Sequence, residues 1–244
     1  MTAADAPTGA VNAAQPPTVA RMFGRIAPRY DLLNTLMTFG MDADWRARAV
    51  AAAAPPPDGR ALDVGTGTGA LALALARAMP RGHVVGVDFT GPMIARAPAR
   101  AGAAGLAEQA RFAQADALRL PFPDTNFDCV TSAFVVRNVA DLAQAFREQA
   151  RVLRPGGRAV CLELTRPRLP LFRQVFAWYF HGWVPRLGAL VAGDAAAYTY
   201  LPESVDHFPD PATLAEIIRQ AGFARVRYEV LGLGTVSLHV GERA

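Results

Sequence analysis

The segment at positions 61–69, Ala-Leu-Asp-Val-Gly-Thr-Gly-Thr-Gly, constrains the fold more than any other part of the chain. A short apolar run ends in three glycines at alternate positions, and an alanine-leucine run typical of a helix follows. Glycines have no Cβ, so the backbone can turn tightly and approach a ligand closely. The helix that follows directs free N–H groups at that ligand. The ligand itself stays open, because Gly65, Gly67 and Ala70 also fit the G-x-G-x-x-A pattern of dinucleotide-binding proteins.

The rest of the chain alternates between predicted strands and predicted helices. The strands are expected at 60–64, 83–88, 110–115, 127–134 and 158–164, and the helices at 71–79, 92–104, 142–153 and from about 211. Two further strands, 226–231 and 235–240, are separated by Gly-Leu-Gly and predict a hairpin. This order predicts an α/β fold, a Rossmann-like doubly wound sheet of seven strands that ends in an antiparallel hairpin. Hydride-transfer dinucleotide folds usually end in another parallel unit instead.

A chain of 244 residues accommodates one α/β domain, which we place at 21–244. Residues 1–20 are rich in Ala, Pro and Thr, hold one charge, and are expected to form a disordered tail without the features of a signal peptide. Residues 21–57 are expected to form a helical cap. In this cap Leu32, Leu33, Leu36, Met37 and Phe39 have the spacing of one helix face. Residues 165–210 are expected to form an aromatic, helical insertion over the active site.

Charge and cysteine content limit the cell compartment and the partners. All 25 basic residues are arginine against 21 acids, which leaves a net charge of +4. This excess reflects either genome base composition with a solvated surface or attraction to an anionic membrane face. Cys129 and Cys161 lie in apolar strand runs and are expected to be buried thiols in a reducing compartment. We therefore expect a cytoplasmic protein, and any contact with the inner face of the membrane would be peripheral.

Three aspartates mark the ends of the first three predicted strands, namely Asp63, Asp88 and Asp116. The carboxyl ends of parallel strands meet at one edge of a doubly wound sheet, where ligands bind. Asp88 can accept hydrogen bonds from ribose hydroxyls, and Asp116 with Ala117 can hold the adenine amine. Each aspartate alone also fits a helix cap or a turn. Together they favour an adenosyl cofactor, and acidic surroundings beneath the glycine turn favour the sulfonium of S-adenosylmethionine (SAM) over a pyrophosphate.

Four motifs distinguish the chain further. They are Phe23-x6-Tyr30-Asp31-x2-Asn34-x5-Gly40-x4-Trp45, Arg137-Asn138-Val139, Arg151-Val152-Leu153-Arg154-Pro155-Gly156-Gly157 and Asp194-x3-Tyr198-x-Tyr200-Leu201-x2-Ser204. With these motifs the chain resembles a class I methyltransferase and, more narrowly, the ubiquinone/menaquinone biosynthesis C-methyltransferase family. The resemblance implies the class I methyltransferase fold and SAM as cofactor. It also implies methylation of a ring carbon of a lipophilic prenylated quinol, either demethylmenaquinol or a methoxy-polyprenyl-benzoquinol.

The resemblance places Thr68, Asp88, Asp116 and Ala117 on positions that contact the cofactor. The full predicted cofactor-binding set is Asp63, Gly65, Gly67, Thr68, Gly69, Asp88, Asp116, Ala117 and Ala133. Three positions depart from the family pattern: Ala70 stands in place of an Asp, Val135 in place of a Gly, and Ala133 in place of a Ser that lines the cofactor site. These departures bear on the identity of the substrate more than on methyl transfer.

The predicted catalytic residues are polar groups within apolar sequence around the expected mouth of the site: Tyr30, Asp31, Asn34, Arg137, Asn138, Tyr198 and Tyr200. Displacement at a sulfonium needs alignment and a nucleophilic carbon, which a quinol supplies once a hydroxyl loses its proton. Arg137 would stabilise the phenolate, and Asp31 or a tyrosine would accept the proton. Alternatively, Tyr30 and Asp31 only anchor the N-terminal helix, and Arg137 with Asn138 only fixes a loop. The four histidines lack the spacing of a metal site.

The apolar and aromatic side chains of residues 165–210, with their flanking arginines, fit either a lid that contacts the membrane or a homodimer contact. A methyltransferase for another small molecule and an NAD-dependent oxidoreductase are the alternative enzymes. The second is disfavoured by the hairpin and by the absence of a Tyr-x3-Lys pair in a chain without lysine. Dispersed basic residues argue against nucleic acid as a partner.

Overall fold

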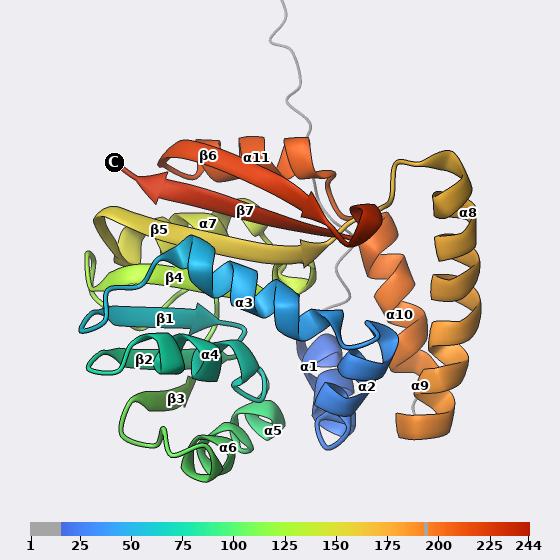
Figure 1. Cartoon of the computed structure of the whole chain (residues 1–244), viewed down its shortest axis with the longest axis horizontal. Helices are drawn as coiled ribbons and strands as arrows, with labels where there is room; N and C mark the ends of the chain where they lie inside the picture. Colours follow the sequence, from blue (N-terminus) through green and yellow to red (C-terminus); the bar gives the residue numbers. More distant parts are fainter. Residues whose placement is uncertain (1–15, 193–194) are drawn as a thin grey trace, which may run out of the picture.

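The computed structural model describes residues 16–192 and 195–244, which build a seven-stranded sheet with the order β3-β2-β1-β4-β5-β7-β6 (Figure 1). The strands are β1 (Arg60–Val64), β2 (His83–Asp88), β3 (Ala110–Gln114), β4 (Phe127–Ala133), β5 (Leu153–Leu164), β6 (Phe223–Leu231) and β7 (Val236–Arg243). Neighbouring strands from β3 to β5 pair in parallel, and β7 runs antiparallel between β5 and β6. The predicted doubly wound sheet with a C-terminal hairpin is confirmed.

Helices cover both faces of the sheet, because its strands are apolar on both sides. On one face lie α3 (Met41–Ala53) and α4 (Ala70–Ala78), and on the other lie α7 (Leu142–Val152) and α11 (Pro211–Gln220). Trp45 and Leu75 belong to the core on the first face, and Phe146 and Leu214 belong to the core on the second. The helices α5 (Gly91–Ile94) and α6 (Ala97–Ala103) follow β2 along the chain.

A third group of helices gathers at the carboxyl ends of the parallel strands (Figure 1). It comprises α1 (Pro16–Ile26) and α2 (Tyr30–Met37) from the N-terminal part, and α8 (Pro170–Trp178), the π-helical turn η2 (Tyr179–Trp183), α9 (Val184–Ala192) and α10 (Ala195–Asp206) from the insertion. Met22, Leu33, Phe180 and Val184 are buried together in a separate small core. The two predicted accessory segments, far apart in sequence, therefore form one unit over the ligand edge of the sheet.

The N-terminal segment differs from its prediction at both ends. Helix α1 begins at Pro16 and buries Val19, so residues 16–20 are helical rather than part of a tail, while residues 1–15 lie outside the described part. Helix α2 ends at Met37, and Phe39 with a φ of 51° lies beyond it. The predicted single apolar face is wrong, because Leu33 is buried whereas Leu32 and Leu36 are exposed.

Two predicted boundaries inside the sheet region also differ. The helix expected at 92–104 is two helices, and Pro98 in the first turn of α6 starts the second because it cannot continue a preceding turn. The strand expected from position 158 begins at Leu153, directly after α7. The register shifts between Phe127 and Cys129 of the neighbouring strand, so the Pro-Gly-Gly segment is a bulge within β5 rather than a stop before it.

Candidate functional site

The glycine run forms the predicted turn between β1 and α4. Gly65, Gly67 and Gly69 have φ values of 68°, 56° and 89°, all in the left-handed region that favours glycine. A Cβ on Gly65 would lie 2.5 Å from Val135 Cβ, so only glycine fits beneath this side chain. Gly69 precedes α4, whose first residue is Ala70. The strand, turn and helix predicted from the sequence are therefore confirmed.

A cavity of about 130 Å³ lies at the carboxyl ends of β1 to β4, beside the glycine turn. This smaller cavity has the predicted residues Gly65, Gly67, Asp88, Asp116, Ala117, Ala133 and Asn138 in its wall. It lies where the strand order reverses between β1 and β4, which is the ligand edge of a doubly wound sheet.

The carboxylate of Asp88 is anchored in this wall by two backbone donors. The N–H of Gly67 donates to one oxygen at 2.9 Å, and the N–H of Thr90 donates to the other at 2.7 Å. Burial raises the pKa of Asp88 above its usual value, and these hydrogen bonds act in the opposite direction. Asp116 is exposed and accepts a hydrogen bond from the N–H of Leu118 at 2.9 Å. Both carboxylates retain lone pairs for hydroxyl or amine donors of a ligand.

Asp63 lies beneath the glycine turn, as predicted, but its side chain does not reach either cavity. Its side chain is 1% exposed, lies outside the walls of both cavities described here, and accepts a hydrogen bond from the Thr131 hydroxyl at 2.7 Å. Burial raises the pKa of Asp63 to about 6. Asp63 therefore fixes the base of the glycine turn from β1 rather than facing the ligand.

Thr68 and Asp31 contact each other instead of a cavity. Thr68 is buried, and its hydroxyl donates toward Asp31, 2.9 Å from each carboxylate oxygen. Arg100 from α6 donates to both side chains. Neither Thr68 nor Asp31 lies in the wall of the two cavities, so the structure brings these predicted cofactor and catalytic residues together with each other, away from both cavities.

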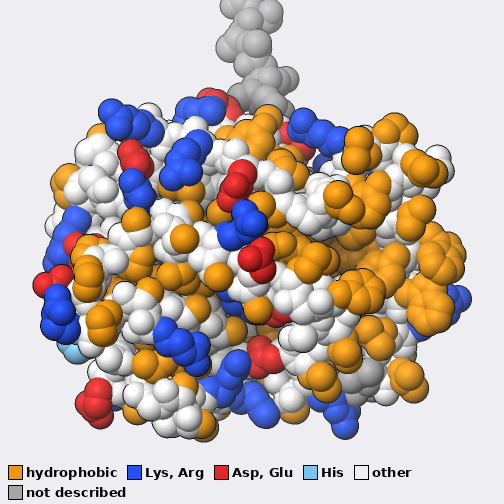
Figure 2. Space-filling view, viewed as in Figure 1, with side chains coloured by type: hydrophobic (Ala, Val, Ile, Leu, Met, Phe, Trp, Pro, Cys, Tyr) orange, Lys and Arg blue, Asp and Glu red, His pale blue; other side chains and the backbone are white. Residues whose placement is uncertain are grey.

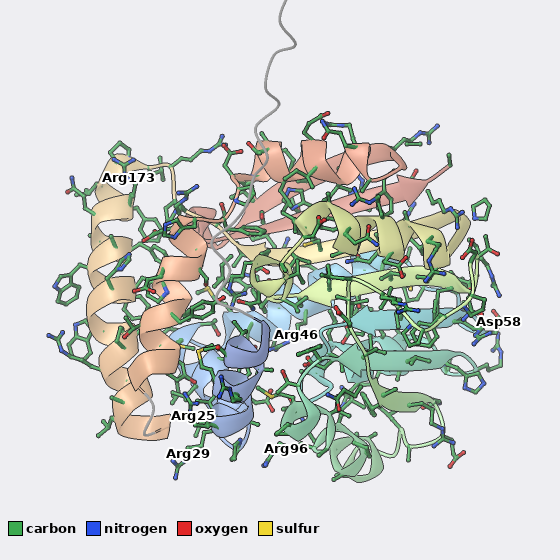
Figure 3. All side chains as sticks on the ribbon, turned by 180° about the vertical axis from the view of Figure 1, so that it is seen from behind. Arg25, Arg29, Arg46, Asp58, Arg96 and Arg173 are labelled. Atoms are coloured by element: carbon green, nitrogen blue, oxygen red, sulfur yellow. The ribbon has the colours of Figure 1, made fainter. Side chains whose placement is uncertain are left out.

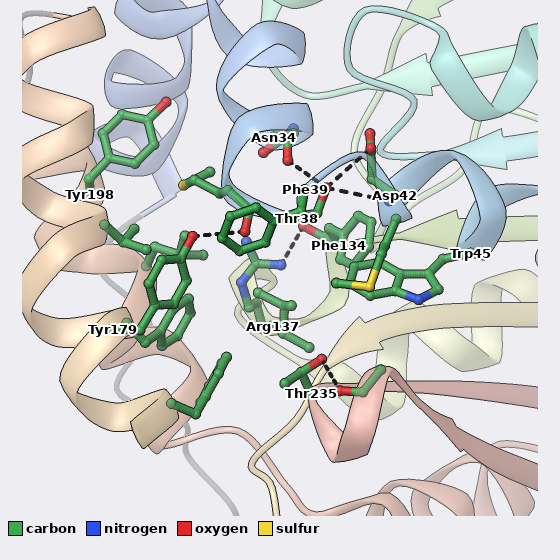
Figure 4. Close-up of a pocket in the computed structure, with 18 of the residues that line it drawn as sticks. Asn34, Thr38, Phe39, Asp42, Trp45, Phe134, Arg137, Tyr179, Tyr198 and Thr235 are labelled. Atoms are coloured by element: carbon green, nitrogen blue, oxygen red, sulfur yellow. Dashed lines mark hydrogen bonds between the residues drawn. The ribbon is translucent and has the colours of Figure 1, made fainter. Parts of the chain in front are cut away.

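A second, larger cavity of about 490 Å³ lies under the accessory helices. Its wall is formed mainly by apolar and aromatic side chains of α1, α2, α3, α8, η2 and α10, together with the end of β4. Figure 4 shows Arg137 and Phe134 between side chains of the N-terminal segment and Tyr179 and Tyr198 of the insertion. The Tyr179 hydroxyl donates to the carbonyl of Met37 at 2.9 Å and joins the insertion to α2 across this cavity.

The two cavities adjoin, because Phe23, Tyr30 and Phe134 lie in the walls of both. The Phe23 and Tyr30 rings meet edge to face with centroids 6.0 Å apart. Phe134 directly follows β4 and has a φ of 58°, a strained conformation for a side chain of this size. A molecule in the smaller cavity and a molecule in the larger one would therefore meet at these three aromatic residues.

Arg137, in the wall of the larger cavity, is buried in an ion pair. Its guanidinium lies 2.7 Å from the carboxylate of Glu163 and donates to the carbonyl of Phe134 at 2.7 Å. Its Nε donates to the Ser204 hydroxyl at 3.3 Å. The pair fixes the strained end of β4 and presents a charged group, already partly neutralised, to an apolar cavity.

The remaining predicted catalytic residues line the larger cavity, except Asn138, which lies in the wall of the smaller one. The Tyr200 hydroxyl donates to the side-chain oxygen of Asn138 at 3.1 Å and links the walls of the two cavities. Burial raises the pKa of Tyr30 and of Tyr200, so both hydroxyls stay protonated at neutral pH. Tyr198 and Asn34 lie in the wall of the larger cavity. Asp194 of the same motif lies outside the described residues.

Sequence reasoning missed several residues that shape the site. Glu163, buried against Arg137, is an acid near the carboxyl end of a strand, as Asp63 and Asp88 are, and that pattern was the available signal. Asp42 lines the larger cavity and pairs with Arg46 at 2.6 Å. Arg100 lies far from both partners in sequence, and no local pattern points to it.

The sheet order with an antiparallel β7, and a cavity with carboxylates at the strand ends, define a class I methyltransferase fold. Solved structures with this fold include a SAM-dependent methyltransferase from Aquifex aeolicus, with a TM-score of 0.60, 17% identity, and coverage of 94% of this chain and 98% of the other. The [4+2]-cyclase SpnF has a TM-score of 0.63 at 18% identity, with 96% and 98% covered. At these identities the likeness concerns the fold alone.

Sequence comparison is more specific. The model of the ubiE/COQ5 methyltransferase family matches residues 10–243. The demethylmenaquinone methyltransferase of Thermus thermophilus is 51% identical over 222 residues, covering 91% of this chain and 100% of the relative. The ubiquinone/menaquinone biosynthesis C-methyltransferase of Desulfotalea psychrophila is 42% identical, covering 92% of this chain and 90% of the relative. The chain belongs to the ubiE/COQ5 methyltransferase family, and the predicted resemblance is confirmed.

Proposed function

We propose that the chain transfers the methyl group of SAM to a ring carbon of a prenylated quinol, with demethylmenaquinol as the first candidate. The observation that carries this proposal is the pair of adjoining cavities, one polar at its strand-end carboxylates and one nearly apolar, which share Phe23, Tyr30 and Phe134 in their walls. Both demethylmenaquinone and ubiquinone/menaquinone enzymes occur among the relatives, which fits a lipophilic quinol substrate.

The smaller cavity offers hydrogen-bond acceptors that match the hydroxyl and amine donors of SAM. Asp88 and Asp116 supply acceptors for the ribose hydroxyls and the adenine amine, and Gly65 and Gly67 allow close approach of the ligand to the backbone. When bound there, SAM supplies an activated methyl group on a positively charged sulfur. Asp63 and Thr68 are buried and lie outside the cavity wall. They therefore support the glycine turn and do not face SAM.

The residues around the larger cavity act mainly by orientation and by charge. Tyr30 stays protonated and therefore donates a hydrogen bond to a ring oxygen rather than removing its proton. Tyr200 also stays protonated, and because its one proton is donated to Asn138, its oxygen accepts a hydrogen bond from a ring hydroxyl. Arg137 stabilises negative charge that develops on that oxygen, and Asn138 holds the Tyr200 hydroxyl in place. The apolar remainder of the cavity excludes water and accepts the ring with the first part of its prenyl chain.

Another quinol or a different small lipophilic molecule is the second candidate substrate. Val135 favours this second candidate, because the family pattern has glycine at position 135. The Val135 side chain lies over Gly65 and narrows the space there. Competition between short-chain demethylmenaquinol and a methoxy-benzoquinol, compared in the wild type and in Val135→Gly, separates the two ring types. A preference that reverses in the variant assigns ring selection to this position.

Isothermal titration with SAM and with NAD, followed by a methyl-transfer assay on short-chain demethylmenaquinol, tests the proposal. We expect binding of SAM without binding of NAD, and a product that is one methyl group heavier. Tight binding of NAD without binding of SAM would remove the basis of the proposal and would support the oxidoreductase alternative.

We further propose that the insertion contacts the membrane and receives the quinol from it. Exposed apolar side chains gather over α8 and around a hollow beside it (Figure 2). They include Leu171 at 76% exposure, Trp178 at 66% and Phe39 at 77%, and the last two also line the larger cavity. Residues 165–192 carry four arginines and no acid, which fits an anionic lipid surface. No helix in the described ranges is long and apolar enough to cross a bilayer.

Flotation with anionic vesicles tests this contact with Arg168→Ala combined with Arg173→Ala, because both side chains are exposed and Arg173 lies on α8 (Figure 3). Each arginine near such a surface contributes about 1 kcal/mol, so binding should weaken on the order of 30-fold and should fall with salt. The matched control is Arg77→Ala with Arg111→Ala, which removes the same charge elsewhere. Unchanged flotation combined with a dimer in solution would assign the apolar patch to a homodimer contact.

A further inference from the structure

Three side chains from three separate elements converge beside the smaller cavity. Arg100 from α6 donates through Nη1 to the carboxylate of Asp31 on α2 at 2.6 Å and to the Thr68 hydroxyl of the glycine turn at 2.5 Å. The same nitrogen lies 3.3 Å from the carbonyl oxygen of Thr68. The Thr68 hydroxyl is in turn 2.9 Å from both oxygens of Asp31. Each of the three residues therefore contacts the other two.

This cluster joins the N-terminal helices to the part of the sheet that forms the smaller cavity. Val19, Ala20 and Phe23 of α1 lie in the wall of that cavity, so α1 covers it. Helix α1 also packs closely on α5, since a Cβ on Gly24 would lie 3.2 Å from Pro92 Cγ. Helix α1 therefore forms part of the wall that encloses a ligand in the smaller cavity.

The cluster also fixes the residue that separates the two cavities. Tyr30 immediately precedes Asp31 in the first turn of α2, and its ring lies in the walls of both cavities. Holding Asp31 against the glycine turn therefore sets the position of Tyr30 relative to any molecule bound beside Gly65 and Gly67. A displacement of α2 would open the smaller cavity and move Tyr30 in one motion.

A contribution to overall stability does not account for this arrangement. The side chains of Arg100 and Asp31 are 39% and 38% exposed, and ion pairs with such exposure contribute little to folding. Nor does the cluster face a substrate, because Asp31, Thr68 and Arg100 all lie outside both cavity walls. The remaining role is a local tether that holds α2 against the glycine turn and α6.

We propose that Arg100 is a positioning residue that holds the N-terminal helices closed over the bound SAM, acting through Asp31 and Thr68. This inference rests on the proposed function. Closure retains SAM and its thioether product S-adenosylhomocysteine in the smaller cavity and aligns Tyr30 with the transferred methyl group. The tether acts on ligand residence and on alignment, not on the chemistry of the methyl group itself.

Titration calorimetry and stopped-flow dissociation with SAM and S-adenosylhomocysteine test the tether in Arg100→Ala, Arg100→Lys and Asp31→Asn. We expect Arg100→Ala to weaken binding of both ligands on the order of 10-fold, mainly through faster dissociation. Arg100→Lys keeps one charged donor and should recover part of the affinity. The control Arg111→Ala breaks an exposed pair with Glu108 and should bind like the wild type. The melting temperature of Arg100→Ala should fall by only a few degrees.

Two further results decide the outcome. In the double variant Asp31→Asn with Arg100→Ala, the loss of affinity should be smaller than the sum of the two single losses, because both variants break one tether. Affinity and dissociation rate within two-fold of the wild type in Arg100→Ala would overturn the inference. A large fall in melting temperature shared by Arg100→Ala, Arg100→Lys and Asp31→Asn would also overturn it, because that result indicates a folding role. Failure of the wild type to bind SAM would instead refute the proposed function, and the tether with it.

Discussion

Replacement of Gly65 by alanine should damage the turn for two separable reasons. The residue has a φ of 68°, and a Cβ there would lie 2.5 Å from Cβ and 2.7 Å from Cγ1 of Val135, with Cγ2 closer still. The left-handed backbone costs an alanine about 1–2 kcal/mol. Overlap with a side chain that must move costs about 1–3 kcal/mol more. Gly65→Ala should therefore lower the free energy of unfolding by about 2–5 kcal/mol.

The overlap contribution can be removed without changing the backbone conformation. In Gly65→Ala combined with Val135→Gly no side chain remains at position 135, so only the left-handed backbone cost of about 1–2 kcal/mol should persist. The two substitutions should therefore be coupled by about 1–3 kcal/mol. Val135→Gly alone supplies the reference, since glycine has its own cost there.

Urea denaturation of the four proteins of this cycle at one pH gives the coupling energy, and calorimetry with SAM reports on the ligand side of the turn. We expect weak SAM binding in Gly65→Ala and recovery of binding in the double variant. Additivity of the two substitutions within about 0.5 kcal/mol would refute the reasoning, because it would mean that Val135 does not restrict position 65.

Three other experiments test the site. The pKa of Asp63 is about 6 in the folded protein against 3.8 for the free side chain, so the folded state binds this proton more tightly. The free energy of unfolding should therefore fall by about 2 kcal/mol between pH 4 and 6, out of about 3 kcal/mol over the full titration, and Asp63→Asn should flatten that part of the urea-derived profile. Glu163→Ala leaves the Arg137 charge buried without its partner and should cost about 3–5 kcal/mol in urea unfolding, whereas Glu163→Ala with Arg137→Met should recover most of it. Tyr200→Phe removes the hydrogen bond to Asn138 and should lower kcat on the order of 10-fold with little change in the KM for SAM; an unchanged kcat would exclude a role in orientation.

The positions of the strands along the chain and the glycine turn could be predicted from sequence because each depends on a local pattern. Alternating apolar runs determine where strands occur, and the Gly-Leu-Gly hairpin determines the antiparallel end of the sheet. The same logic located Asp88 and Asp116, since strand ends meet at one edge. Boundaries failed where tertiary pairing overrode local chemistry: β5 continues through Pro-Gly-Gly because it pairs with β4 at Leu153.

The roles of individual polar residues were less predictable, because they depend on partners distant in the chain. Asp31 looked like a proton acceptor, and its partner Arg100 lies 69 positions away. Asp63 was predicted to contact the ligand, but its side chain is buried. Successive side chains of a strand point to opposite faces, so a shift of one position decides which side a residue faces. Arg137 lies in the predicted position, and its ion pair with Glu163 appears only in three dimensions.

Methyl transfer from SAM labelled with carbon-13 in its methyl group tests the central claim most directly. With short-chain demethylmenaquinol as the acceptor, carbon NMR of the product should show the label bonded to a ring carbon, with S-adenosylhomocysteine formed in equal amount. A label on a quinol oxygen, or no labelled quinol from a protein that binds SAM, would contradict C-methylation of a quinol by this chain.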